Sequence, residues 1–276
     1  MSKRKLTRQQ AFRIQRIQDE RIDRARRRDA EADARRESGQ LGAEEEGRVI
    51  AHYGSQLEIE ALQGAHAGTC YRCFQRANLE PLVTGDHVIW QAPLDLSEEN
   101  PLGVITALLP RQSLLVRPDP YGKLKPVAAN IDCILLVIAP LPTPSALLID
   151  RYLVACELTG IAPIILLNKA DLLTPESAAA CDALLAEYRA IGYLTRQVSA
   201  SEGQLADLSS LIQTQTVVFV GQSGVGKSSL INTILPHALQ RTAALSDNSQ
   251  LGQHTTTTAR LFHLPSGGSL IDSPGI

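Results

Sequence analysis

The pattern of hydrophobic and polar positions divides the chain into two parts. From residue 131 onward, short apolar runs alternate with helical stretches, beginning with a continuous apolar run at 131–139. A strand that is apolar on both faces is typical of a parallel sheet covered by helices. The pattern therefore predicts a doubly wound α/β sheet. The expected strands lie at 131–139, 163–168, 194–200, 216–220, 259–264 and 269–273, and the expected helices at about 145–159, 176–190 and 204–212, with a fourth ending near residue 235.

Residues 45–116 instead show short stretches rich in β-forming residues, separated by turn residues. Apolar residues alternate with glutamates at 56–62, as expected for a half-buried strand. About five short strands in some 70 residues predict a small closed barrel of OB or SH3 type, and we favour the OB-fold. The stretches fall at 47–54, 55–62, 69–75, 86–92, 103–109 and 113–117. A segment rich in Pro, Gly and Lys at 117–130 is expected to lead into the α/β domain, 117–276.

The first 44 residues are polar and rich in arginine. Residues 1–37 hold 13 basic and 7 acidic side chains, a net charge of +6, whereas the remainder holds 14 basic and 22 acidic ones, a net charge of −8. We interpret 1–44 as a basic, disordered arm that orders on RNA through phosphate contacts. The alternative is a solvated charged tail.

Composition excludes several classes of protein. Hydrophobic residues make up 44% and charged residues 20%, which rules out wholesale disorder, collagen and coiled coil. The odd number of cysteines, five, and a beginning without a secretory signal favour a reducing cytoplasm. The longest apolar stretch, 133–149, is interrupted by three prolines and is short for a membrane span. Cys70 and Cys73 form a single CxxC, which we interpret as two strand residues rather than a zinc site.

The strongest motif is GQSGVGKS at 221–228, which fits the pattern G-x-x-x-x-G-K-[ST] between a β-branched strand and an amphipathic helix. Glycines let backbone N–H groups surround phosphate oxygens at the positive end of the helix. Lys227 is expected to reach the β- and γ-phosphates, acting in catalysis, and Ser228 to bind Mg²⁺. The predicted phosphate-binding residues are Gly221, Gln222, Ser223, Gly224, Val225, Gly226, Lys227, Ser228 and Ser229.

Two further motifs indicate guanine. The sequence Asn168-Lys169-Ala170-Asp171 closes a strand at the edge where α/β sheets bind ligands, and it resembles the NKxD signature of GTPases. Asp171 would accept hydrogen bonds from guanine N1 and N2, and adenine offers neither donor. Another strand ends in the dipeptide Ser199-Ala200, which resembles the loop whose backbone contacts guanine O6.

The magnesium-binding and switch motifs come last. The sequence DSPG at 272–275 resembles DxxG, in which Asp272 would hold Mg²⁺ through water and the Gly275 amide would sense the γ-phosphate. The segment 252–258, GQHTTTT, resembles switch I. Its four threonines leave the Mg²⁺ ligand open, with Thr256 or Thr257 favoured, and a plain polar surface loop is the alternative.

The order of these motifs identifies a family. Ordinary GTPases run from the P-loop to NKxD, whereas here NKxD and Ser-Ala come before the P-loop, switch I and DxxG, as in a circular permutation. Together with VTGDHVIW at 83–90 and KLKPVAANID at 123–132, this order resembles the RsgA (YjeQ) family of circularly permuted GTPases of small-subunit ribosome assembly. The resemblance runs from residue 47 to 276.

The resemblance implies a GTPase that binds the 30S subunit and its 16S rRNA late in maturation and hydrolyses GTP with Mg²⁺, stimulated by the subunit. We expect a cytoplasmic monomer. Ile276 stands where Ras-like enzymes have the water-orienting Gln, so intrinsic hydrolysis should be slow. His254 is the nearest substitute, with a solvated loop histidine as the alternative.

The family also has a C-terminal zinc-binding domain. No Cys/His cluster that could serve it occurs in this chain, so we expect zinc and its ligands to be absent here. Two other functions stay open. One is a different P-loop enzyme, such as an ATPase or nucleotide kinase, which NKAD argues against. The other is a GTP-dependent RNA-binding adaptor with negligible hydrolysis.

Overall fold

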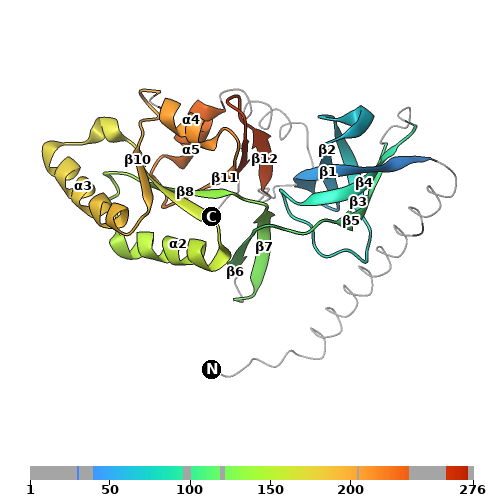
Figure 1. Cartoon of the computed structure of the whole chain (residues 1–276), viewed down its shortest axis with the longest axis horizontal. Coiled ribbons are helices and arrows are strands. Elements are labelled where there is room, and N and C mark those ends of the chain that lie inside the picture. Colours follow the sequence, from blue (N-terminus) through green and yellow to red (C-terminus); the bar gives the residue numbers. More distant parts are fainter. Residues whose placement is uncertain are drawn as a thin grey trace, which may run out of the picture. The chain divides into compact units, whose positions relative to one another are not determined.

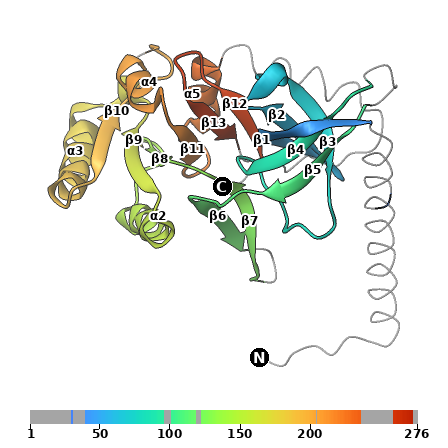
Figure 2. The same cartoon turned by 45° about the vertical axis from the view of Figure 1, so that its right-hand side comes forward.

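The computed structural model describes Ala30 and residues 40–95, 101–118, 122–203, 205–235 and 259–272. Their contacts separate into two compact units, and the elements are labelled in Figure 1, with β9 and β13 labelled in Figure 2. Of the described residues, those up to Val49 together with those of Tyr53–Leu82 and His87–Leu109 form the first unit. The described residues of Ile50–His52, of Val83–Asp86 and from Pro110 onward form the second. The predictions made for the basic arm up to residue 39, for switch I and for 273–276 lie outside the described residues.

The first unit is a closed five-stranded β-barrel. Strands β2 and β3 are antiparallel, as are β4 and β5, whereas β3 and β5 are parallel, and an additional antiparallel pairing of β1 with β4 closes the barrel. This strand order confirms the OB-fold and excludes the SH3 alternative. The strands are β1 (Leu41–Tyr53), β2 (Gln56–Ala61), β3 (Cys70–Gln75), β4 (His87–Pro93) and β5 (Gly103–Leu108), in the order β1-β2-β3-β5-β4.

The alternation predicted for 56–62 holds on one face only. Leu57, Ile59 and Ala61 are buried in the barrel core around Trp90, as expected. Glu60, expected on the solvent face, is only 9% exposed, and its carboxylate lies 3.5 Å from the guanidinium of Arg48. The barrel therefore covers part of the outer face of this strand as well.

The second unit is built on a six-stranded sheet in the order β10-β9-β8-β11-β13-β12. The pairings among β10, β9, β8, β11 and β13 are all parallel, and β12 joins β13 antiparallel. Every residue of β8 is buried, as its continuous apolar sequence predicts. The strands are β8 (Cys133–Ile138), β9 (Ala162–Leu167), β10 (Leu194–Gln197), β11 (Thr216–Val220), β12 (Arg260–His263) and β13 (Ser269–Asp272).

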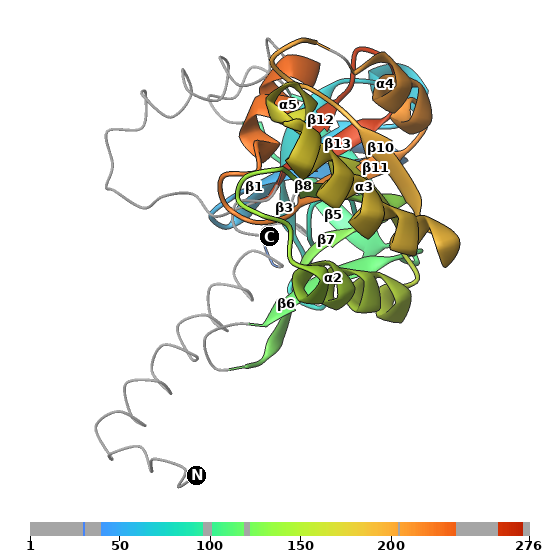
Figure 3. The same cartoon turned by 90° about the vertical axis from the view of Figure 1, so that its left-hand side faces the viewer.

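Helices cover both faces of this sheet, which confirms the α/β class. The buried residues of α4 and α5 pack into one core with the sheet, while α2 contacts β8 and β9 and α3 contacts β10. Figure 2 and Figure 3 show α2 and α4 on opposite faces. None of the helices in the described part of the chain is long and apolar enough to cross a bilayer. The helices are α2 (Ala146–Thr159), α3 (Pro175–Ala190), α4 (Ala206–Ile212) and α5 (Lys227–Ile234).

The structure differs from the sequence prediction where the two units join along the chain. The stretch 113–117, expected among the barrel strands, and part of the expected linker form a separate two-stranded antiparallel sheet of β6 (Leu114–Pro118) and β7 (Leu124–Ala129). The boundary expected after residue 116 thus falls inside β6. At the other end, β1 begins at Leu41 rather than at 45, because β4 continues to pair with it as far as Pro93.

Candidate nucleotide-binding site

The P-loop connects β11 to α5. Three of its glycines have positive φ angles, +142° at Gly221, +84° at Gly224 and +91° at Gly226. A side chain at Gly221 would overlap the carbonyl oxygen of Val137 in β8, and one at Gly226 would overlap the side-chain amide of Asn168. Gly221 and Gly226 are therefore required both by backbone conformation and by the close approach of neighbouring segments, and Gly224 by backbone conformation alone. Val225 is buried, whereas Gln222, Ser223, Ser228 and Ser229 are exposed around the loop and the first turn of α5.

Lys227 folds back over this loop. Its ammonium group donates hydrogen bonds to the carbonyl oxygens of Gly221, at 2.5 Å, and Gln222, at 2.8 Å. Desolvation by partial burial lowers the pKa of Lys227. An anion bound in the loop would offset that desolvation, because an opposite charge nearby favours the ammonium form. The loop is thus arranged to accept phosphate oxygens.

The NKAD motif is tied directly to the P-loop. The backbone N–H of Asn168 donates to the carbonyl of Ile138, and its side-chain amide donates to the carbonyl of Val225 at 2.9 Å. Lys169 adopts a left-handed conformation, with φ of 59°, and its ammonium donates to the carbonyl of Gly224 at 2.7 Å. Residues more than 50 positions apart in the chain are therefore hydrogen-bonded into one surface.

Asp171 is exposed and oriented by two serines. The hydroxyl of Ser199 donates to its carboxylate at 2.6 Å, and the hydroxyls of Ser199 and Ser201 lie 3.0 Å apart. The hydrogen bond from Ser199, followed by that from Ser201, lowers the pKa of Asp171. The carboxylate is thus held ionised, as an acceptor for two adjacent N–H donors. Ser201 was not predicted from the sequence; its only signal is its position two residues after Ser199.

The second guanine motif is attached to the same surface. The backbone N–H of Ala170 donates to the carbonyl of Val198, the residue before Ser199, at 3.2 Å. The carbonyl of Ala200 accepts a hydrogen bond from the hydroxyl of Thr233 in α5, at 3.3 Å. The structure therefore brings together NKAD, Ser-Ala and the P-loop at one edge of the sheet.

The DxxG aspartate lies at that edge too. Strands β11 and β13 are adjacent and parallel, so Asp272 ends β13 next to the strand that leads into the P-loop. Burial raises the pKa of Asp272, and a bound cation would favour its ionised form. The hydroxyl of Ser228 and the carboxylate of Asp272 are oxygen ligands of the kind that Mg²⁺ prefers, so these residues fit a magnesium ion. Thr256, Thr257, His254, Gly275 and Ile276 lie outside the described residues.

The CxxC cysteines do not converge. Both belong to β3, where a spacing of three places them on opposite faces; Cys70 is exposed and Cys73 is buried in the barrel core. Desolvation raises the pKa of the Cys73 thiol. In the part of the chain that the structure describes, no three His, Cys, Asp or Glu side chains group as metal ligands would.

Comparison with known proteins agrees with these motifs. A family model described as RsgA GTPase matches residues 108–276. The chain is 56% identical to the small ribosomal subunit biogenesis GTPase RsgA of Azotobacter vinelandii, covering all of this chain and 79% of that protein. It is 53% identical to the protein of the same name from Marinobacter nauticus, covering 100% of this chain and 78% of that one.

Solved structures show the same fold. The structure of YjeQ from Thermotoga maritima matches with a TM-score of 0.65 and 28% identity, over 84% of this chain and 75% of that chain. The structure of YloQ, a circularly permuted GTPase, matches with a TM-score of 0.63 and 30% identity, over 84% and 72%. From its motif order, its fold and these relatives, the chain belongs to the RsgA GTPase family and is a circularly permuted GTP hydrolase.

Proposed function

We propose that this protein hydrolyses GTP to GDP and phosphate during late maturation of the 30S ribosomal subunit, bound to the subunit through its 16S rRNA. The observation that carries the proposal is the linked surface of NKAD and P-loop, in which Asn168 and Lys169 bind P-loop carbonyls while Ser199 orients Asp171. The names of the relatives, small ribosomal subunit biogenesis GTPases, support the cellular role.

Guanine is selected by the carboxylate of Asp171, which accepts from N1 and N2, and by the backbone at Ala200, which contacts O6. The amides of the P-loop surround the phosphates, and the ammonium of Lys227 exchanges its loop carbonyls for β- and γ-phosphate oxygens. Charge that develops on these oxygens in the transition state is then stabilised by a group already in place.

Ser228, a switch I threonine (Thr256 or Thr257) and Asp272, through water, are the residues that would hold Mg²⁺. When bound, the ion neutralises charge on the β- and γ-phosphates. The Gly275 amide contacts the γ-phosphate. Water attacks the γ-phosphorus in line, the bond to the bridging oxygen breaks, and GDP leaves. Because Ile276 cannot orient that water, His254 or a group of the ribosomal subunit supplies this role.

The 30S subunit is recognised through RNA. OB-folds bind single-stranded nucleic acid, and a basic arm adds phosphate contacts. The proposed form is a cytoplasmic monomer. Because Ile276 stands at the position of the catalytic Gln, the second candidate function is an adaptor that binds GTP and RNA with negligible hydrolysis.

Phosphate release from GTP, measured with and without purified 30S subunits, tests both functions, with ATP as the control nucleotide. We expect slow release that the subunit accelerates, and none from ATP. Tight GTP binding without release in either condition would favour the adaptor, and equal use of ATP would contradict the assignment of NKAD.

A further inference from the structure

A four-residue loop that lies between β3 and β4 of the barrel in the sequence belongs to the second unit. Val83–Asp86 is assigned there, although the residues on both sides of it belong to the first unit. The loop holds two fully buried polar residues, Thr84 at 1% exposed and Asp86 at 0%. The proposed mechanism uses neither. Buried polar groups cost free energy unless they are paired, so their partners indicate what the loop does.

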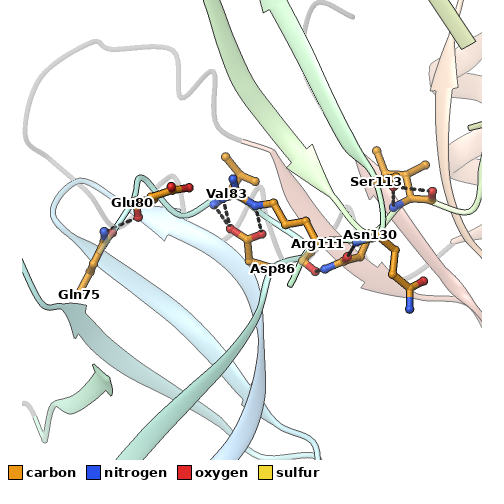
Figure 4. A network of polar contacts seen from close by, with 10 residues as sticks. Gln75, Glu80, Val83, Asp86, Arg111, Ser113 and Asn130 are labelled. Atoms are coloured by element: carbon orange, nitrogen blue, oxygen red, sulfur yellow. Dashed lines mark hydrogen bonds and ion pairs between the residues drawn. The ribbon is translucent and has the colours of Figure 1, made fainter. Parts of the chain in front are cut away.

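The loop is held in one conformation by Asp86 (Figure 4). The guanidinium of Arg111 donates to both carboxylate oxygens, Nε to Oδ1 at 2.7 Å and an Nη to Oδ2 at 2.8 Å. Oδ2 also accepts from the backbone N–H of Val83, at 2.7 Å. Bidentate, charge-assisted pairs of this kind define geometry as well as energy. Asp86 thus closes the loop on itself and ties it to the chain just before β6.

The other side of the loop is held by the end of β7. The backbone N–H of Ala129 donates to the carbonyl of Thr84 at 3.0 Å, and the side-chain amide of Asn130 donates to the carbonyl of Gly85 at 2.8 Å. The side-chain oxygen of Asn130 accepts from the backbone N–H of Gln112. The end of β7 and the segment just before β6 therefore brace the loop.

Gly85 brings the loop against β13. Its φ of +92° favours glycine, and a Cβ at this position would overlap the carbonyl of Ala129 and lie 3.2 Å from Cδ1 of Ile271. Ile271 is the residue immediately before Asp272. The backbone of the loop is thus packed beneath the strand end that carries the proposed magnesium-binding carboxylate.

Thr84 holds the partner strand. Its hydroxyl donates to the carbonyl of Ala259 at 2.8 Å, and both residues are buried. Ala259 directly precedes β12, whose first residue, Arg260, is the pairing partner of Asp272. The loop therefore contacts both strands of the β12–β13 pair at the end where Asp272 lies.

We propose that Thr84 is a positioning residue for GTP hydrolysis: its hydroxyl, held in place by the Asp86–Arg111 pair, fixes the start of β12 and thereby the position of Asp272. The proposal rests on the magnesium-binding role given to Asp272 above. Thr84 is far in sequence from every nucleotide-binding motif, and it acts on the metal side of the site rather than on the guanine or P-loop side.

The test compares Thr84→Val, which removes the donor, with Thr84→Ser, which retains it. For Thr84→Val we expect kcat to fall about 10-fold or more, because small displacements of a catalytic group are costly. The second measurement is the Mg²⁺ concentration at which the slowing of fluorescent GDP release by Mg²⁺ reaches half of its maximum. In Thr84→Val this concentration should rise about 10-fold, as when a group that orients a metal ligand is removed. Affinity for GDP in the absence of Mg²⁺ should stay within about twofold, since NKAD and the P-loop are untouched. In Thr84→Ser, which keeps the hydroxyl donor, both kcat and this Mg²⁺ concentration should stay close to those of the wild type.

Ser113→Ala is the matched control. The hydroxyl of Ser113 bonds the backbone of Ile131 in the same unit, and among the residues that the structure describes its hydrogen bonds do not reach β12 or β13. This variant should lower the melting temperature without changing kcat or the Mg²⁺ dependence.

The proposal is overturned if Thr84→Val behaves like Ser113→Ala, or if Thr84→Ser loses kcat and Mg²⁺ affinity as Thr84→Val does. An inactive wild-type protein under the same conditions would overturn the proposed function together with this inference, whereas an active wild type beside a fully active Thr84→Val overturns the inference alone.

Discussion

At the scale of single residues, the proposed recognition of guanine depends on one carboxylate and the hydroxyls around it. Asp171 is exposed, so its orientation comes from hydrogen bonds rather than from packing. The sequence motif identifies the carboxylate, and only the structure identifies Ser201 as part of its support.

Replacing Asp171 with Asn exchanges an acceptor for an amide and should shift preference from guanine to xanthine nucleotides. Loss of hydrogen bonds to a charged group predicts a decrease in GDP affinity of about 1.5–3 kcal/mol, roughly 10- to 100-fold. Titration with fluorescent GDP and XDP measures the exchange. Asp182→Asn, an exposed aspartate of α3 paired with Arg189, is the control and should change neither affinity. An unchanged preference for GDP over XDP in Asp171→Asn would contradict the assignment of Asp171 to guanine recognition.

Lys227→Ala and Ser228→Ala test the other end of the nucleotide. Both side chains lie at the P-loop and outside the core, so the fold should persist while phosphate release falls by about 100-fold or more. Circular dichroism and phosphate release on the same samples separate folding from catalysis. A folded variant that hydrolyses GTP at the normal rate would contradict the P-loop assignment.

At the scale of elements, glycines let strands and loops approach where the nucleotide motifs meet. Gly226 permits the carbonyls of the P-loop to reach the amide of Asn168, so the positions of NKAD and the P-loop are mutually dependent. The pattern G-x-x-x-x-G-K-[ST] predicts glycine here for phosphate binding, but the contact with Asn168 is a second reason that only the folded chain supplies.

Gly226→Ala should therefore weaken GDP binding and lower the free energy of unfolding by about 1–3 kcal/mol. Gly160→Ala is the matched control, because Gly160 also has a positive φ, +67°, but nothing lies within 4 Å of the added Cβ. Chemical denaturation and GDP titration of both variants separate the strain of a positive φ from the steric overlap of the added Cβ with Asn168. Equal effects on GDP binding in the two variants would mean that contact with Asn168 is unimportant.

At the scale of the whole molecule, charge is unevenly distributed along the chain. The first 37 residues carry 13 of the 27 basic side chains, whereas the remainder is net acidic. Since an acidic body repels RNA phosphates, attachment to rRNA should depend strongly on the arm. A deletion of the arm should end before Gln40, because β1 begins at Leu41 and the carbonyl of Gln40 accepts a hydrogen bond from the backbone N–H of Leu94.

Deleting residues 1–39 should weaken 30S binding and reduce the slope of log affinity against log salt by roughly 0.7–0.9 for each phosphate that the arm neutralises in the full-length protein. GDP affinity should be unchanged, since none of the nucleotide motifs is removed. Binding of the full-length and shortened proteins to 30S subunits over a range of salt concentrations measures this. Identical slopes would mean that the arm binds no phosphate.

Motifs and periodicity, read from the sequence alone, determined the α/β class, the barrel and the permuted order of the GTPase signatures. They could do so because these features depend on local patterns: apolar runs, the period of burial along a strand, and glycine spacing. The tertiary structure decided what depends on contacts between distant segments. It selected the OB strand order through the parallel pairing of β3 with β5, buried Glu60, paired β6 with β7, and placed Thr84 against Ala259 and Gly85 against Ile271. No local pattern encodes these pairings, because their partners lie from 6 residues away, for Pro118 and Leu124, to 186 residues away, for Gly85 and Ile271, and are chosen by the packing of the whole unit.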